Sequence, residues 1–455
     1  MENIQKDNPK IIRAWTFYDW ANSVFPLVIN SAIFPAFYEY QTTVRDDVTK
    51  QIVSDTIVVW GHTFKNTEFY SYFVSFALLI VCFTAPILSG IADYRGSKKR
   101  FLAGFCVLGS FSCAGLFFFD NANIAWSMIP FVTATVGYWG SLVFYNAYLP
   151  EIASVEKQDR VSARGFALGY LGSSILLILN LAFIIMKVFK NAFPDYAALH
   201  SGLDARVAMV TVAVWWFCFA QYTLKLLPKG EPAVPNSNDG NIFTKGFREL
   251  GKVFRDLKHQ VALKRFLGSY FFYNMGVQTV MYMATLFAAK EIEWPNEEYK
   301  GTALIISILL IQFLGMAGSF LFSWLSSKIG NIKALGLAIF IWIVICVSVF
   351  LFINTPMEFY CIAASVGLVM GGIQALSRST YSKLLPETKD HASYFSFFDV
   401  SEKLGIVIGT FSFGFIEGLT GSMRQSVLAL ISFFVLGFIG LFFIPKVGNK
   451  LSGTT

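Results

Sequence analysis

Long apolar segments alternate with short polar ones along nearly the whole chain. Twelve of these apolar segments are long enough to cross roughly 30 Å of hydrocarbon, for which an α-helix needs about 20 residues. A spanning segment has to pair its backbone polar groups internally, so we expect each of the twelve to be a helix. The predicted helices lie at 15–38, 69–91, 101–119, 124–149, 165–187, 207–227, 263–289, 302–325, 334–354, 357–384, 394–418 and 425–445.

A polar, basic segment at 228–262 separates six of these helices from the other six. We therefore predict an all-α integral membrane protein with two pseudo-symmetric six-helix bundles, at 1–227 and 263–455, joined by a cytoplasmic linker. Three short matches recur in the same order in both halves: FYD at 17–19 with FYN at 272–274, the turn at 89–100 with 323–333, and YNAYLPE at 145–151 with YSKLLPE at 381–387. Such repeats are typical of secondary transporters, which bind substrate between the halves near the bilayer midplane.

The charged residues are few, and their placement predicts an orientation. Only 14% of the 455 residues are Asp, Glu, Lys or Arg, against about 25% in soluble proteins. With a cytoplasmic N-terminus, most of the 36 Lys and Arg residues fall on the cytoplasmic side, as the positive-inside rule requires. Both termini would then be cytoplasmic, and the net charge of +7 would face anionic lipid rather than a nucleic acid.

The chain lacks the common motifs of ATP-driven and catalytic proteins. It contains no GxxxxGK[ST] phosphate loop, no HExxH metal site and no GxSxG nucleophile elbow. Its six cysteines have no metal-ligand spacing. We therefore expect no enzyme activity, no cofactor and no metal, and a monomer whose partners are the bilayer, a small solute and protons.

Polar side chains inside the predicted helices are the candidate substrate contacts. Asp19, Asn22, Pro26 and Asn30 follow each other at helical spacing on one face of the first helix. A polar face is expensive against lipid, so it should line the interior or a water-filled cavity. From helices 1, 4, 7 and 10 we predict these substrate contacts: Asn22, Asn30, Tyr145, Asn146, Asn274, Gln278 and Gln374.

Charged residues inside the helices are candidates for coupling. Asp19 is the first candidate, because a buried carboxylate can carry a proton or hold a substrate ammonium. The alternative for Asp19 is an interfacial carboxylate that the helix dipole stabilises. Asp399, Glu402 and Lys403 form a second charged cluster. Within it Asp399 and Lys403 are i,i+4 partners and form the second candidate, which is either a structural salt bridge or a pair that opens during transport. Arg378 is a further candidate, as an ion-pair partner or a carboxylate binder.

The turn DYRGSKKR at 93–100 resembles the signature loop of the major facilitator superfamily. Gly96 permits a tight turn, and Asp93 can pair with a cation or with the N-terminus of a neighbouring helix. In that superfamily the loop latches the outward-facing state. The resemblance therefore implies a gating role for five residues: Asp93, Arg95, Gly96, Lys98 and Arg100. The alternative is a basic turn that only fixes the orientation in the membrane.

Three further segments resemble one branch of this superfamily. FYDWANS at 17–23, GGIQALSRS at 371–379 and FFDVSEKLG at 397–405 are similar to signatures of the vacuole-effluxer-like group, whose eukaryotic members are associated with autophagy. The resemblance implies a secondary active transporter of neutral amino acids that works by alternating access. The short loops favour a bacterial inner membrane. The alternatives are a sugar, a drug or a lipid-like cargo, and a transport-dead sensor or scaffold on the same fold.

Overall fold

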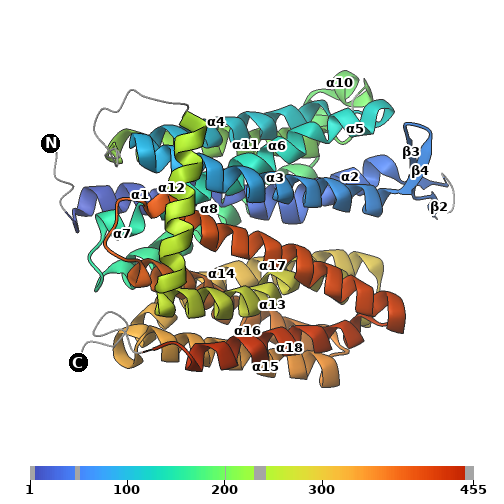
Figure 1. Ribbon diagram of the computed structural model, residues 1–455. Helices are drawn as coiled ribbons and strands as arrows, with labels where there is room; N and C mark the ends of the chain where they lie inside the picture. The colour runs from blue at the N-terminus through green and yellow to red at the C-terminus, as the bar shows by residue number, and fades with distance from the viewer. Residues whose placement is uncertain (1–5, 47–51, 200, 230–241, 446–455) are drawn as a thin grey trace.

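The computed structural model describes residues 6–46, 52–199, 201–229 and 242–445 (Figure 1). Within these ranges the chain contains twelve long, roughly parallel helices, which coincide with the twelve predicted segments. Eleven of the helices in the described part are long and apolar enough to cross a membrane. The twelfth, α13 (Val261–Glu291), carries charged residues at both ends and a polar face in its middle.

The first half supplies the upper helices of Figure 1. Its long helices are α1 (Pro9–Asn22), which continues through a π-helix (Phe25–Ile33) into α2 (Phe34–Thr42), α3 (Asn66–Arg95), α4 (Lys98–Gly115), α6 (Ile129–Asn146), α8 (Gln158–Ile185) and α11 (Leu203–Leu226). Its short elements are 3-10 turns at Leu116–Phe118 and Asn121–Asn123, α5 (Ile124–Ser127), α7 (Leu149–Ile152), α9 (Val188–Ala192) and α10 (Pro194–Leu199). Two small antiparallel sheets pair β1 (Val44–Arg45) with β2 (Ile52–Ser54), and β3 (Thr56–Val59) with β4 (His62–Lys65).

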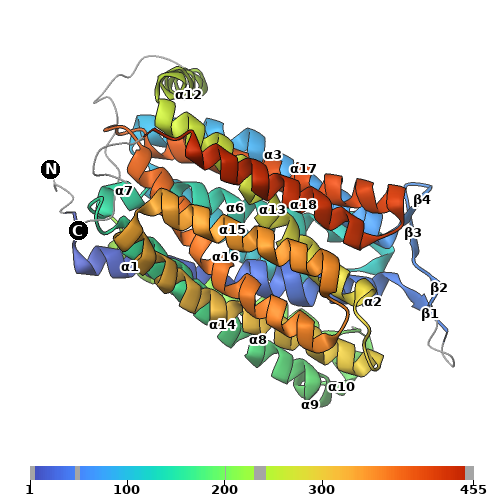
Figure 2. The same cartoon turned by 90° about the horizontal axis from the view of Figure 1, so that it is seen from below.

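The second half supplies the lower helices of Figure 1. After α13 follow α14 (Glu297–Ile329), α15 (Asn331–Phe352), α16 (Pro356–Leu384), α17 (His391–Thr420) and α18 (Met423–Phe442). We call the end of the molecule where α1 begins and α18 ends the terminal end; the strands lie at the opposite end (Figures 1 and 2). Large apolar side chains such as Phe83, Phe411 and Leu419 are exposed, which is the pattern that lipid contact requires.

Four helix pairs make the main contacts between the two halves. Helix α8 packs against α14 and α16, while α17 packs against α3 and α6; Figure 2 shows α14 lying beside α8. Helix α12 (Ile242–His259) lies in the predicted linker and crosses the terminal end of the bundle (Figure 1). It packs on α3 of the first half and on α17 of the second, with Val253 fully buried.

Candidate functional site

A cavity of about 190 Å³ lies between the two halves. Its wall is formed by α1 with the π-helix, α6 and α8 of the first half and by α13, α14, α16 and α17 of the second. Its larger polar lining residues are Asp19, Asn30, Asn146, Asn274, Gln278, Gln312, Gln374, Arg378 and Glu402. Nearly half of the remaining lining residues are aromatic: Phe25, Tyr138, Trp139, Phe166, Tyr170, Tyr270, Tyr273, Tyr282 and Phe398.

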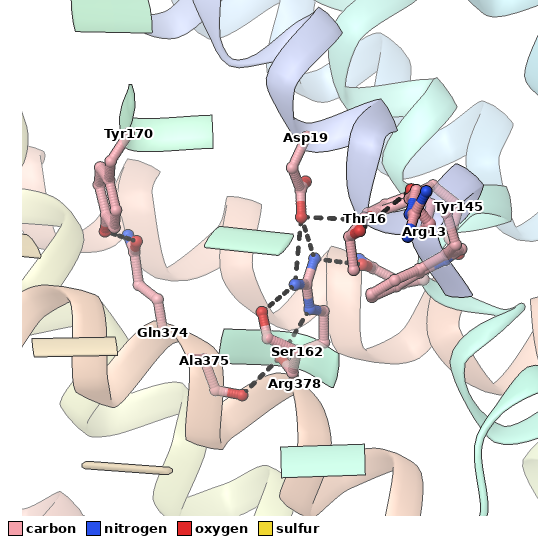
Figure 3. A network of polar contacts seen from close by, with 11 residues as sticks. Arg13, Thr16, Asp19, Tyr145, Ser162, Tyr170, Gln374, Ala375 and Arg378 are labelled. Atoms are coloured by element: carbon pink, nitrogen blue, oxygen red, sulfur yellow. Dashed lines mark hydrogen bonds and ion pairs between the residues drawn. The ribbon is translucent and has the colours of Figure 1, made fainter. Parts of the chain in front are cut away.

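An ion pair between the halves closes the cavity on the side of the terminal end. Asp19 of α1 accepts hydrogen bonds at Oδ2 from Nη1 and Nη2 of Arg378 on α16, both at 3.2 Å (Figure 3). The Tyr145 hydroxyl donates to the same oxygen at 2.8 Å. Only 7% of the Asp19 side chain and 4% of the Arg378 side chain are exposed, so water can replace little of what each charge gains from its partner.

The first half surrounds the remaining faces of the Arg378 guanidinium. Nε donates to the Ser162 hydroxyl, and Nη2 donates to the Ser162 carbonyl, both at 2.9 Å. The guanidinium carbon lies 4.2 Å from the centre of the Phe166 ring and 4.8 Å from that of Trp15, within the range of cation–π attraction. Arg378 is thus the point at which the second half is anchored in the first.

Gly165 on α8 leaves the space that this ion pair occupies. A Cβ atom at this position would lie 2.9 Å from Nη2 of Arg378 and would also meet Oδ2 of Asp19. Both side chains are buried and held by several partners, so they have little room to move aside. The ion pair therefore requires a residue without a Cβ atom, which is glycine, at position 165.

We expect Gly165→Ala to lower transport roughly tenfold or more, since overpacking of this kind costs about 1–3 kcal/mol. The measurement is the initial rate at which purified protein in liposomes takes up its transported solute, normalised to the amount of folded protein. Gly104→Ala is the matched control, because a Cβ atom on Gly104 meets no atom within 4 Å. Equal uptake by both variants would show that the pair tolerates displacement.

Five of the seven predicted substrate contacts line the cavity: Asn30, Asn146, Asn274, Gln278 and Gln374. The prediction was wrong for the other two, which lie outside the lining of the cavity. Asn22 is buried outside the lining, because a residue three positions after Asp19 lies about 60° around an α-helix from it, and Ser23 takes the cavity face instead. Tyr145 is buried outside the lining and contacts the ion pair instead, through its bond to Asp19 and with its ring 5.5 Å from the guanidinium carbon of Arg378.

The second predicted coupling pair lies in the cavity wall rather than on its surface. Lys403 is completely buried and pairs with Asp399, its i,i+4 neighbour on α17. Its ammonium also lies 3.2 Å from Glu402 and 3.7 Å from the centre of the Trp139 ring in the first half. Glu402 itself faces the cavity and accepts a hydrogen bond from Gln278 at 2.8 Å. The sequence placed Glu402 in the same charged cluster, but we predicted a coupling role only for Asp399 and Lys403.

A first polar cluster, the Asp93 cluster, joins the halves at the terminal end. Asp93 accepts hydrogen bonds from the backbone N–H groups of Ala392 and Ser393, at 3.3 and 2.7 Å, and from the Ser393 hydroxyl at 2.8 Å. These N–H groups belong to the first turn of α17, where the helix dipole favours a negative charge. The cluster also includes Lys98, Glu151 and His391: Lys98 pairs with Glu151, which lies 2.8 Å from the His391 ring.

Three of the five predicted gating residues thus have defined positions in or beside this cluster. Asp93 and Lys98 are buried, and Gly96 adopts a φ of +62° at the end of α3, a conformation that glycine tolerates best. Arg95 and Arg100 are exposed instead. Their guanidinium groups can stay hydrated at the surface, so they need no partner within the cluster.

A second cluster, the Asp159 cluster, joins the halves on the other side of the terminal end. Asp159 at the start of α8 accepts hydrogen bonds from Lys383 at 2.7 Å, from Asn331 at 2.8 Å and from Ser326 at 2.9 Å. Sequence reasoning missed this cluster. The signal was Lys383 itself, a charge in YSKLLPE at the position where YNAYLPE has Ala147.

Comparison with known proteins agrees with this architecture. A family model described as vacuole effluxer Atg22 like matches residues 7–450. The Bacillus subtilis protein named uncharacterized MFS-type transporter YxiO is 29% identical over 434 residues, covering 95% of this chain and 94% of its own. Autophagy-related protein 22-1 of Phaeosphaeria nodorum is 24% identical over 511 residues, covering 93% and 88% of the two chains.

Solved structures of similar shape are transporters of the major facilitator superfamily (MFS). The transporter FucP in its outward conformation superposes with a TM-score of 0.69 at 14% identity, over 97% of this chain and 99% of its own. The proton:xylose symporter XylE reaches a TM-score of 0.63 at 12% identity, over 98% and 97% of the two chains. These identities are low, so the likeness concerns the fold alone.

Proposed function

Because this chain belongs to the Atg22-like vacuole effluxer family of MFS transporters, we propose that it carries neutral amino acids across a membrane by alternating access. It is a multi-pass membrane transporter and not an enzyme. The observation that carries the amino-acid proposal is the buried Asp19–Arg378 pair beside the cavity. A zwitterion presents a carboxylate that fits Arg378 and an ammonium that fits Asp19.

Charge balance favours a zwitterion over a charged cargo at this pair. A neutral amino acid can exchange one ion pair for two, Arg378 with its carboxylate and Asp19 with its ammonium, without adding net charge to a largely buried site. A cavity of about 190 Å³ also favours a small solute, since pockets for drug-sized ligands are about 300–1,000 Å³. Amide groups of Asn30, Asn274 and Gln374 supply further donors and acceptors.

The polar clusters support a proposal about which half of the transport cycle this conformation represents. The Asp93 and Asp159 clusters and Arg378 close the terminal end, and the cavity extends from Arg378 toward the opposite end. We propose that both termini are cytoplasmic, in a bacterial inner membrane, which makes this conformation outward-facing. In the inward-facing state these contacts would break and the opposite end would close.

The test is counterflow in proteoliposomes loaded with one unlabelled solute and exposed to the same solute with a label. A panel of neutral amino acids is compared with charged amino acids, sugars and a lipid-like dye. We expect transient accumulation of one group of neutral amino acids and of no other class. Accumulation of a sugar or the dye instead would replace the cargo, and folded protein that binds a solute without exchange would indicate a sensor.

A further inference from the structure

The charges of α17 beside the cavity do not balance. Two carboxylates, Asp399 and Glu402, share the single ammonium of Lys403. Their side chains are 3% and 16% exposed, and Lys403 is not exposed at all. By contrast, Asp19 and Arg378 neutralise each other one to one. An excess negative charge in a low-dielectric wall is costly, so a further positive charge is favoured there.

The described residues of the neighbouring elements supply no such charge. From α13, Gln278 donates a hydrogen bond to Glu402 and the phenols of Tyr270 and Tyr282 line the same cavity. From α6 come Tyr138 and Trp139, and from α3 the thiol Cys82 interacts with Asp399 and Lys403. Arg378 is the one cationic side chain among the described residues that line the cavity, and it already pairs with Asp19.

We propose that Glu402 binds a proton from the cavity and is the proton-coupling carboxylate of this transporter. Glu402 lines the cavity, whereas Asp399 lies behind it, so Glu402 has the direct access to water that proton exchange needs. Its protonation leaves Lys403 paired with Asp399 alone, and the cluster becomes neutral. This inference deepens the proposed function and rests on it only for the statement that the proton drives transport.

The position of Lys403 connects this proton to the movement of the halves. Its ammonium lies over the Trp139 ring of α6, across the interface between α17 and the first half. When α17 moves against α6 during alternating access, an unbalanced charge would have to pass this aromatic wall. A neutral cluster avoids that electrostatic cost, so proton binding at Glu402 and movement of α17 are linked.

The experiment measures the proton directly. Infrared difference spectra of the purified full-length protein, recorded between high and low pH, report the C=O stretch of newly protonated carboxylic acids. We expect Glu402→Gln to lose one such signal, and Glu402→Asp to retain it because the carboxyl group remains. Glu417→Gln is the matched control on α17, since Glu417 pairs with the exposed Lys290 at the opposite end.

Two further variants and a salt series make the assignment exclusive. Asp399→Asn removes the excess negative charge and should weaken the signal at the same pH. Persistence of the full signal in folded Glu402→Gln, or its loss in Asp19→Asn instead, would overturn the proposal. Removal of the signal by sodium at constant ionic strength would assign the site to a metal cation and overturn it as well.

Transport supplies the second readout and separates the two proposals. In proteoliposomes with an imposed pH gradient, we expect Glu402→Gln to lose gradient-driven accumulation of the exchanged amino acid, while Glu417→Gln keeps it. If no amino acid exchanges with the wild-type protein but the infrared signal depends on Glu402, the cargo is wrong and the proton site stands. If exchange is present and gradient-driven accumulation persists in Glu402→Gln, the proton site is wrong and the cargo stands.

Discussion

Replacing Arg378 by alanine should abolish transport. The substitution leaves Asp19 in a buried site without its ion-pair partner, and breaking a buried pair in this way costs about 3–5 kcal/mol. It also removes the guanidinium that we expect to hold the substrate carboxylate. Since about 1.4 kcal/mol corresponds to a factor of ten, we expect counterflow to fall roughly a hundredfold or more.

Arg378→Lys distinguishes charge from geometry. Lysine keeps the positive charge, but it lacks the planar fork that serves two oxygen acceptors at once and the flat face that stacks on Phe166. We expect intermediate activity from this variant. Arg255→Ala, at an exposed position on α12, serves as the matched control and should transport normally. Full exchange by Arg378→Ala would remove this residue from the substrate site and would contradict the proposed zwitterion contact.

Replacing Lys383 by methionine should open the terminal end. The substitution removes the ammonium that bonds to Asp159 across the halves and also to Asn331. Asp159 would then be buried without a cation, and breaking a buried ion pair in this way costs about 3–5 kcal/mol. This cost is present only while the halves are closed at the terminal end, so we expect the ratio of closed to open protein to fall roughly a hundredfold.

Spin labels can measure this opening. Glu156 and Glu387 are exposed at the terminal end, one in each half, and can be replaced by labelled cysteines after the six native cysteines have been removed. We expect a longer inter-label distance to dominate in Lys383→Met. Lys290→Met is the control, because its pair with Glu417 is exposed and lies within one half. An unchanged distance distribution in Lys383→Met would show that the Asp159 cluster does not hold the closed state.

The two clusters at the terminal end occupy related places in the halves but use different residues. In the first half the acid is Asp93 in the last turn of α3, and it faces the N-terminus of α17. In the second half the corresponding turn carries Ser326 and Asn331, and the acid is Asp159 on α8 of the opposite half. The repeat therefore preserves the places where polar clusters join the two halves, while the residues that form each cluster differ.

The sequence by itself determined the helical architecture, and the structural comparisons confirm it. Hydropathy is a local property, and a segment of apolar residues has to form a helix in lipid wherever its partners lie. The same reasoning identified five cavity contacts, including Asn274 and Gln278, because a polar side chain in a spanning helix has to face inward. The spacing of polar residues along a spanning helix therefore predicted which face of the helix is turned inward.

Only the tertiary structure decided which charges meet. Asp19 and Arg378 are 359 residues apart, and no local pattern encodes contact over such a distance. Asn22 and Ser23 lie about 100° apart around the helix, and the packing of α1 decides which of them faces the cavity. The sharing of Lys403 by Asp399 and Glu402, and its place over Trp139, likewise depend on how α17 packs against α6. Helix identity follows from solvation by lipid, whereas the site follows from the contacts between helices.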